Sequence, residues 1–177
     1  GSTWKVPTRK PAGGRTMPPS QAGMVPAALP AFSAPTGVKV VPRGAGTSLA
    51  GGAIPSEDAV VLGLSKMNRV LAVNYDDRFI RVEAGVTNLS VTAVVAENGF
   101  FYAPDPSSQL ACTIGGNIAN NSGGAHCLKY GVTTNNLLGV RMVLIDGSII
   151  DLGGDYLDSA GLDLLGLVVG SEGQLGI

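Results

Sequence analysis

Three stretches rich in glycine and small polar residues interrupt the apolar segments of this chain, and they constrain its fold more than any other feature. They cover residues 43–53, 112–130 and 170–177. Glycine accounts for 26 of the 177 residues, well above the ~7% of average proteins, yet no Gly-X-Y period is present, so a collagen helix is excluded. Abundant glycine without low complexity indicates backbone packed closely against a ligand. We therefore expect a globular α/β or α+β domain with a ligand site built from loops.

Composition excludes several other classes of protein. Hydrophobic residues make up 45% of the chain and the mean hydropathy is +0.28, which is incompatible with intrinsic disorder. The net charge of −1 carries no nucleic-acid signature, and no apolar run approaches the ~20 residues of a membrane-spanning helix. Two cysteines, Cys112 and Cys127, and the single histidine, His126, provide neither a disulfide framework nor an ordinary zinc site. We therefore predict no metal and a reducing, cytoplasmic setting.

The first 37 residues differ in texture from the rest of the chain. They hold seven of the eleven prolines, four basic residues and no acidic residue. Proline at this density blocks both helix formation and sheet pairing, so we expect an irregular segment. It is interpreted either as a solvated tail or as a binding segment for an acidic partner.

From residue 38 onward, apolar runs alternate with turn signals. Pro42 is expected to end the first strand, Gly99 to end a helix whose N-cap is Thr87, and Asp146-Gly147 to form a hairpin turn. Strands are predicted at 38–41, 59–64, 70–73, 79–83, 100–103, 138–145 and 148–152, and helices at 87–98, 116–121 and 163–169.

The first glycine loop, residues 43–48, follows a predicted strand, as phosphate-binding loops do. It lacks the Gly-Lys-Ser/Thr of a Walker A loop, and Leu49 stands where a dinucleotide fingerprint has its third glycine. Its glycines still permit turns that direct several N–H groups inward as an anion nest, while Thr47 and Ser48 add hydroxyl donors and Arg43 adds positive charge. A wide surface turn that binds nothing is the alternative for this loop taken alone.

Further motifs in a definite order favour a ligand site. The motifs are Pro42-Arg43-Gly44-Ala45-Gly46-Thr47-Ser48, Tyr102-Ala103-Pro104-Asp105-Pro106-Ser107-Ser108, Ile114-Gly115-Gly116-Asn117, Ser122-Gly123-Gly124-Ala125-His126-Cys127-Leu128-Lys129-Tyr130-Gly131 and Gly170-Ser171-Glu172-Gly173. This order resembles the FAD-linked subunit of glycolate oxidase, a member of the vanillyl-alcohol-oxidase (PCMH-type) flavoproteins, among whose relatives are D-lactate and D-2-hydroxyglutarate dehydrogenases. The resemblance covers about residues 38–177.

The resemblance implies an α+β fold, a PCMH-type FAD-binding domain with two subdomains. Residues 38–64 would be a remnant of the first subdomain, and residues 65–177 a second subdomain with a mixed or antiparallel sheet flanked by helices. Members of the family carry a strand and a helix before the position of Val38 and a substrate domain after that of Ile177. The sequence is therefore expected to be truncated in its first subdomain and to lack the C-terminal substrate domain.

The resemblance also implies which residues bind the cofactor. FAD would be non-covalent, because the slot that usually holds histidine in covalently linked members is Ala45. The implied contacts are Pro42, Arg43, Gly44, Ala45, Gly46, Thr47, Ser48 and Gly51 at the pyrophosphate; Pro104, Asp105 and Ser108 near the flavin; Thr113, Gly116, Asn117, Asn121, Ser122 and Gly123 along the ring and ribityl chain; Tyr130 and Gly131 nearby; and Glu172, Gly173 and Ile177 on the adenine side.

The activity implied is oxidation of a small 2-hydroxy acid, with hydride passing from the substrate α-carbon to flavin N5 in the complete enzyme. Partners would be an electron acceptor or other oxidase subunits, and the protein would be cytoplasmic, peripheral to a membrane only through such subunits. No catalytic residue is assigned; His126 and Lys129 are the candidates, with a structural role for His126 and a solvated surface position for Lys129 as alternatives. The other functional interpretations are a non-catalytic FAD- or nucleotide-binding module and an inactive fragment.

Overall fold

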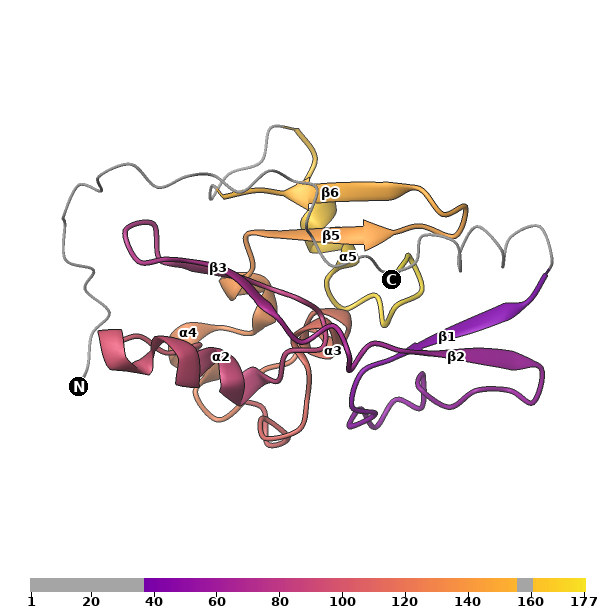
Figure 1. Cartoon of the computed structure of the whole chain (residues 1–177), viewed down its shortest axis with the longest axis horizontal. Helices are drawn as coiled ribbons and strands as arrows, with labels where there is room; N and C mark the ends of the chain where they lie inside the picture. The colour runs from indigo at the N-terminus through magenta and orange to yellow at the C-terminus, as the bar shows by residue number, and fades with distance from the viewer. Residues whose placement is uncertain (1–36, 156–160) are drawn as a thin grey trace.

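The computed structural model describes residues 37–155 and 161–177. The irregular segment expected at the N-terminus therefore lies, except for Gly37, outside the described residues. Within them, the strands form three two-stranded sheets and the helices are short. Figure 1 shows a parallel strand pair at one end of the molecule and two hairpins above a layer of helices.

The parallel pair consists of β1 (Lys39–Arg43) and β2 (Ala59–Gly63), in register from Lys39 opposite Ala59 to Arg43 opposite Gly63. The expectation that Pro42 ends the first strand is wrong, because β1 continues through Pro42, which lies opposite Leu62. Within the described residues β1 has no second neighbour, and proline is tolerated on such an edge because its missing N–H need not serve a ladder.

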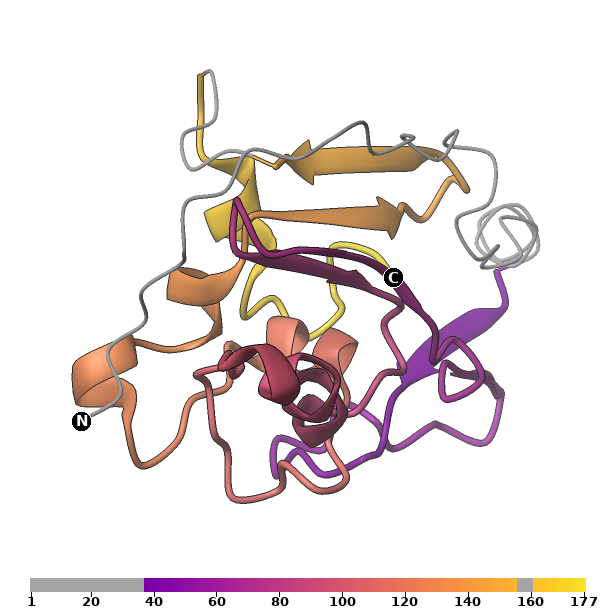
Figure 2. The same cartoon turned by 60° about the vertical axis from the view of Figure 1, so that its left-hand side comes forward.

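Two antiparallel hairpins follow, each closed by a polar turn. β3 (Val70–Asn74) pairs with β4 (Phe79–Val82), and β5 (Gly139–Val143) pairs with β6 (Ile149–Gly153). The predicted turn at Asp146-Gly147 is confirmed: Gly147 has a φ of 84°, and Asp146 Oδ1 accepts from Ser148 N at 2.9 Å. Figures 1 and 2 show β3 running beside β5.

The helices begin and end largely where local signals predict. α2 (Asn88–Val95) is followed by the 3₁₀ turn η2 (Ala96–Asn98), which ends at Gly99 with a φ of 77°. Thr87 is the N-cap residue, but its side chain makes no capping bond. The remaining elements are α3 (Ile114–Asn120), α4 (Cys127–Tyr130), η3 (Thr133–Asn136) and α5 (Leu164–Val168), the last capped by Asp163, whose carboxylate accepts from Gly166 N at 2.8 Å.

The strand predicted at residues 100–103 is absent, and this prediction is wrong. The segment runs past α2 without pairing to another strand, because Tyr102 N donates to Thr92 Oγ1 on α2 at 3.0 Å. The Tyr102 side chain packs against the core, and burial raises the pKa of its phenol to about 12.

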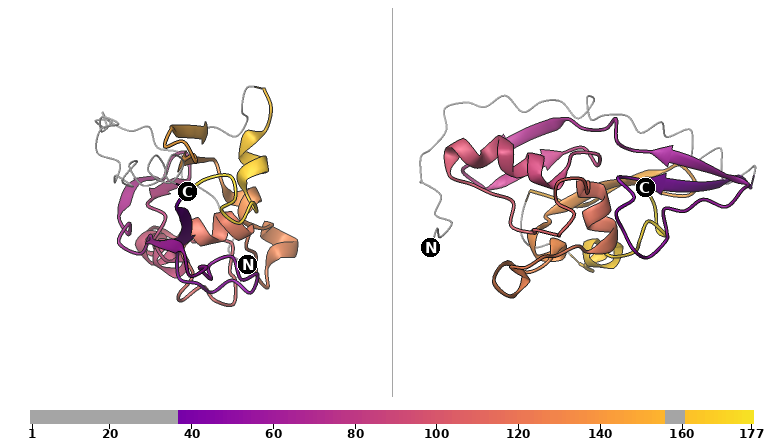
Figure 3. Two further views of the ribbon diagram at one scale, coloured as in Figure 1. Left: turned by 90° about the vertical axis from the view of Figure 1, so that its right-hand side faces the viewer. Right: turned by 90° about the horizontal axis from the view of Figure 1, so that it is seen from below.

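The core lies where α2 and α3 meet the β3–β4 hairpin. Val86, Val91 and Ile114 are its buried members, and Ile80, Val82, Tyr102 and Ile118 pack against them. This core holds together the N-termini of α2 and α3 and the segments that precede them. Figure 3 shows α4 displaced from this region and away from β1 and β2.

Candidate cofactor site

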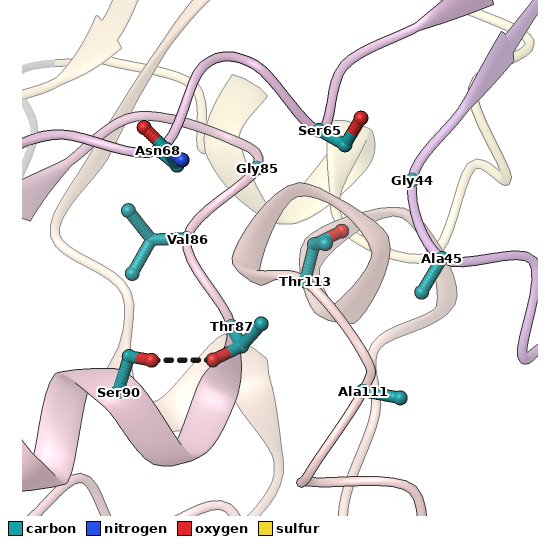
Figure 4. Close-up of a pocket in the computed structure, with 10 residues that line it drawn as sticks. All are labelled: Gly44, Ala45, Ser65, Asn68, Gly85, Val86, Thr87, Ser90, Ala111 and Thr113. Carbon is teal, nitrogen blue, oxygen red and sulfur yellow. Dashed lines mark hydrogen bonds between the residues drawn. The ribbon is translucent and has the colours of Figure 1, made fainter.

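A pocket of about 340 Å³ opens between the first glycine loop and the N-termini of α2 and α3. Figure 4 shows the glycine loop on one side, the turn after β2 above, and the start of α2 opposite. The pocket is lined by Gly44, Ala45, Ser65, Asn68, Gly85, Val86, Thr87, Ser90, Ala111 and Thr113. Two of the lining segments, the first glycine loop and the start of α3, were predicted from the sequence to bind a ligand. The other two, the turn after β2 and the start of α2, were not.

The first glycine loop presents main-chain donors that have no partner in the described chain. None of the N–H groups of residues 44–48 donates a hydrogen bond to any described residue. Gly46 has a φ of 69°, and a Cβ on it would lie 2.9 Å from Arg43 Nη2, so the guanidinium folds against the loop. Free N–H groups beside a cation suit a phosphate, and the loop therefore fits the pyrophosphate of a dinucleotide.

The glycine loop is held against α3. Ser48 Oγ donates to Asn120 Oδ1 at 2.9 Å, and Ala50 N donates to Ser48 Oγ at 3.2 Å. Gly44 lies so close to Thr113 Oγ1 that a Cβ on Gly44 would collide with it. A side chain at position 44 would therefore displace Thr113 or the loop.

The third glycine-rich segment joins the same region. Glu172 N donates to Ala119 O of α3 at 2.8 Å. A Cβ on Gly52 would lie 3.9 Å from Glu172 Oε2, and a Cβ on Gly173 would lie 3.4 Å from Pro42 Cγ. Three segments far apart in the sequence are therefore adjacent in space. Glu172 itself has a φ of 54°, uncommon for a residue other than glycine.

The residues of α3 and its ends that were predicted to bind the cofactor also make hydrogen bonds that stabilise the fold. Thr113 Oγ1 accepts from Gly116 N at 3.3 Å as the N-cap. Asn121 ends α3 with a φ of 47°, and its Oδ1 accepts from Thr134 N and Oγ1, both at 3.0 Å. Asn117 is 1% exposed, and its Nδ2 has no hydrogen-bond partner. Asn117 does not line the pocket.

A second group of predicted residues lies apart from the pocket, around α4. His126 Nδ1 is 2.5 Å from Asp105 Oδ2, and His126 N donates to Asp105 Oδ1 at 3.3 Å. The contact with His126 lowers the pKa of Asp105. Lys129 Nζ lies 5.0 Å from the centre of the Tyr130 ring, which packs edge-on against Phe101. None of these residues lines the pocket.

The other predicted residues are placed by main-chain contacts. Ser122 O accepts from Thr133 N and Oγ1, and a Cβ on Gly123 would collide with Cys127 Sγ. Ile177 exchanges two main-chain hydrogen bonds with Val143 of β5, at 2.7 and 2.9 Å. Pro104 O accepts from Asn88 Nδ2 of α2 at 3.0 Å, and main-chain hydrogen bonds of the three other residues close turns: Gly51, Ser108 and Gly131. Binding roles for these residues stay a prediction.

We expect His126→Ala to raise the pKa of Asp105 toward its ordinary value of 3.8, because the substitution removes the imidazole donor that stabilises the carboxylate. A carboxyl-carbon NMR titration measures the change. Lys129→Ala is the matched control, since Lys129 contacts the Tyr130 ring instead. An unchanged Asp105 titration in His126→Ala would show that the contact does not persist in solution.

The sequence interpretation missed most of the far wall of the pocket. Ser65 and Asn68 stand in the turn after β2, Thr87 is the N-cap residue of α2 and Ser90 lies in its first turn; none of these positions has a glycine pattern of its own. Gly85 was the one sequence signal that could have indicated this wall, because glycine often marks a close approach of two backbone segments. A Cβ there would lie 2.7 Å from Met67 O and collide with Leu64 O, so glycine lets the turn after β2 meet the segment that leads into α2.

Comparison with known proteins identifies the class to which this site belongs. The family model described as an FAD binding domain matches residues 19–153. The match covers most of the chain, and the chain belongs to that family; its cofactor is FAD. The expected α+β FAD-binding fold is confirmed.

Two of the similar proteins are named for the oxidation of a hydroxy acid, and one solved structure is named as a synthase. The glycolate oxidase subunit GlcD of Escherichia coli strain K12 is 53% identical over 140 residues, covering 79% of this chain and 28% of that protein. D-lactate dehydrogenase of Archaeoglobus fulgidus is 42% identical over 147 residues, which cover 82% of this chain and 33% of that protein. An alkyldihydroxyacetonephosphate synthase structure superposes with a TM-score of 0.74 at 27% identity, covering 85% of this chain and 30% of that one.

The chain therefore spans about a third or less of the length of these relatives. Within residues 37–155 and 161–177, no helix has both the length and the apolar character needed to cross a bilayer.

Proposed function

We propose that this chain forms the FAD-binding part of a flavin-dependent dehydrogenase that oxidises a small 2-hydroxy acid, such as glycolate or D-lactate. The observation that carries the proposal is the junction of the unpaired N–H groups of residues 44–48 with α3 and the Glu172 turn. The names of the relatives support the substrate class. Residues 38–64 and 65–177 are proposed as the two subdomains.

The residues of the junction would hold FAD without a covalent bond. The N–H groups of residues 44–48 would donate to the pyrophosphate, and Arg43 would add charge. Ala45 offers no nucleophile to form a covalent bond with the cofactor. In the complete enzyme, bound FAD supplies the acceptor for the hydride that leaves the substrate α-carbon.

The chain alone is proposed to bind FAD without turnover. Catalysis requires the substrate to be held against the acceptor, and none of the ten residues that line the pocket is charged. No carboxylate clamp for a hydroxy acid is therefore present there. His126 and Lys129 lie around α4 instead.

The partners proposed for the complete enzyme are an electron acceptor and further oxidase subunits. The word subunit in the name of the glycolate oxidase relatives supports this. A cytoplasmic location, with membrane contact only through such subunits, is part of the same proposal; two free cysteines are consistent with it.

Purified chain should carry FAD, identified by its visible absorbance and by chromatography of the flavin released on heating. Release of all the flavin supports non-covalent binding, whereas flavin that stays with the precipitated protein contradicts it. Anaerobic addition of glycolate or D-lactate should leave the flavin absorbance unchanged. Bleaching by the chain alone would contradict the absence of turnover, and failure to bind added FAD would overturn the proposed function.

A further inference from the structure

We propose that two copies of this chain associate weakly in solution across a groove between the β5–β6 hairpin and α5, as a two-fold symmetric dimer in which an exposed leucine of each copy enters the groove of the other. This groove, here called the apolar groove, shares no lining residue with the cofactor pocket, so the inference is independent of the proposed FAD-binding function. It is lined from β5 and the position after it, from β6 and from α5 by Met142, Leu144, Ile150, Leu152, Leu164 and Leu167, among others.

The apolar groove exists because the β5–β6 hairpin has one apolar face. Met142 lies opposite Ile150 in the strand register, and both line the groove. Arg141 and Asp151, the next pair along, point to the other face, where Arg141 Nε donates to Asp151 Oδ1 at 2.8 Å. α5 packs beside β6 on the apolar side (Figure 1). All eight lining residues are leucine, isoleucine, valine or methionine, so the groove suits an aliphatic occupant.

Leucine side chains stand exposed on the rim of the apolar groove. Leu164, Leu167 and Leu175 line the groove and are nevertheless 47%, 65% and 45% exposed. Leu162, two residues before α5, is 84% exposed. Single apolar side chains scattered over a surface need no partner, but a group of them around an apolar groove marks a site of association.

The size of the apolar groove favours a single side chain as its occupant. Its volume is about 140 Å³, close to the ~150 Å³ cavity that remains when one buried leucine is cut back to alanine in a protein core. One leucine therefore fills the groove, whereas the row of side chains on a long helix would need a longer one. Leu167 projects from the same face, so the hole and a matching side chain lie on one surface.

A surface that carries both a hole and a matching side chain is complementary to a second copy of itself. In a two-fold dimer every contact is made twice, because the same patch is used by both copies. Leu167 of each copy would fill the groove of the other, with Leu164, one turn earlier on α5, beside it. Because no charged residue lines the groove, the symmetry brings no like charges together inside it.

The exposed apolar area sets the strength of the dimer. Full burial of one leucine side chain removes about 100 Å² from water, so the four partly exposed leucines offer a few hundred Å² per copy. This area is smaller than the ~800 Å² per partner of a stable complex. We therefore expect a dissociation constant on the order of 10–100 µM.

Sedimentation velocity of the purified chain from about 5 to about 500 µM, with and without FAD, tests the inference. The wild type should change from monomer to dimer over this range whether or not flavin is bound. Leu167→Lys should weaken the dimer about tenfold or more, because an ammonium group would have to leave water to enter the apolar groove. Ile149→Lys is the matched control and should leave the dimer unchanged, since Ile149 is 54% exposed on the opposite face of the same hairpin.

A mixture of two variants tests the symmetry. In the two-fold packing, Leu167 of one copy lies beside Leu167 of the other, so Leu167→Lys and Leu167→Glu chains should associate more strongly together than either does alone. No gain on mixing would overturn the two-fold packing. Unfolding midpoints equal to that of the wild type show that each variant is folded.

Three results would overturn the dimer without touching the proposed function. The first is a wild-type chain that stays monomeric at the highest concentration, and the second is a Leu167→Lys chain that dimerises like the wild type. The third is a dimer that forms only after residues 1–36 are removed, because that segment and not a second copy would then cover the apolar groove. A chain that dimerises but binds no FAD would contradict the proposed function and leave the dimer standing.

Discussion

Gly46→Val should abolish FAD retention, with a loss of affinity of about a hundredfold or more. Gly46 has a φ of 69°, a region that β-branched residues avoid. Valine would force the backbone into another conformation and turn the N–H groups of residues 44–48 away from one centre. Loss of two or more charge-assisted hydrogen bonds to phosphate accounts for the expected size. The measurement is flavin absorbance per mole of purified protein, followed by titration with FAD.

Ala45→Gly is the control for this loop, because it adds no bulk and requires no new backbone conformation; its effect on FAD binding should be mild. The contact of a new Cβ at position 46 with Arg43 Nη2, at 2.9 Å, is with the end of a flexible side chain, which can move. The expected loss therefore arises from the backbone. Wild-type occupancy in Gly46→Val would remove the first glycine loop from the cofactor site.

Glu83→Gln should give the largest loss of stability, about 2 kcal/mol in the free energy of unfolding. The Glu83 side chain is 4% exposed, and its two oxygens accept from Arg69 N, Nε and Nη2 at 2.7–3.0 Å. Glutamine replaces one acceptor oxygen by a donor, which leaves an Arg69 N–H facing an NH₂ group. This expected loss of unfolding free energy is at the low end for a buried ion pair, because Arg69 is partly exposed to solvent. Urea unfolding measures it.

The same variant has a definite pH dependence. The hydrogen bond from Arg69 lowers the pKa of Glu83 below 4.5. A lowered folded-state pKa contributes stability that is present above 4.5 and is lost as the pH falls through the lowered value. The difference between wild type and Glu83→Gln should therefore be constant near neutral pH and narrow below pH 4.5. Arg81→Gln, which breaks an exposed pair with Asp155, is the control and should leave the unfolding midpoint unchanged. A gap that widens in acid would contradict the assigned pair.

Local signals predicted those elements whose ends depend on one or two residues. Gly99 ends α2–η2, and Asp146-Gly147 turns β5 into β6, because a positive φ or a side-chain bond to the next turn is a property of the residue itself. The strand expected at 100–103 failed for the converse reason. Its residues have strand character, but a hydrogen bond to Thr92 on a neighbouring helix replaces the pairing that a strand needs.

The polypeptide's own pattern of glycines and hydroxyl residues predicted a ligand site built from loops, since backbone freedom and donor type belong to each residue regardless of its surroundings. Only the folded chain decided which loops share one site. Ser48 and Asn120, 72 residues apart, meet through a hydrogen bond, and Glu172 reaches the main chain of α3. The far wall of the pocket became visible in the same way, because the Arg69–Glu83 pair and the contact at Gly85 bring the turn after β2 beside the N-terminus of α2. Such contacts depend on the path of the whole backbone, which no local run of residues encodes.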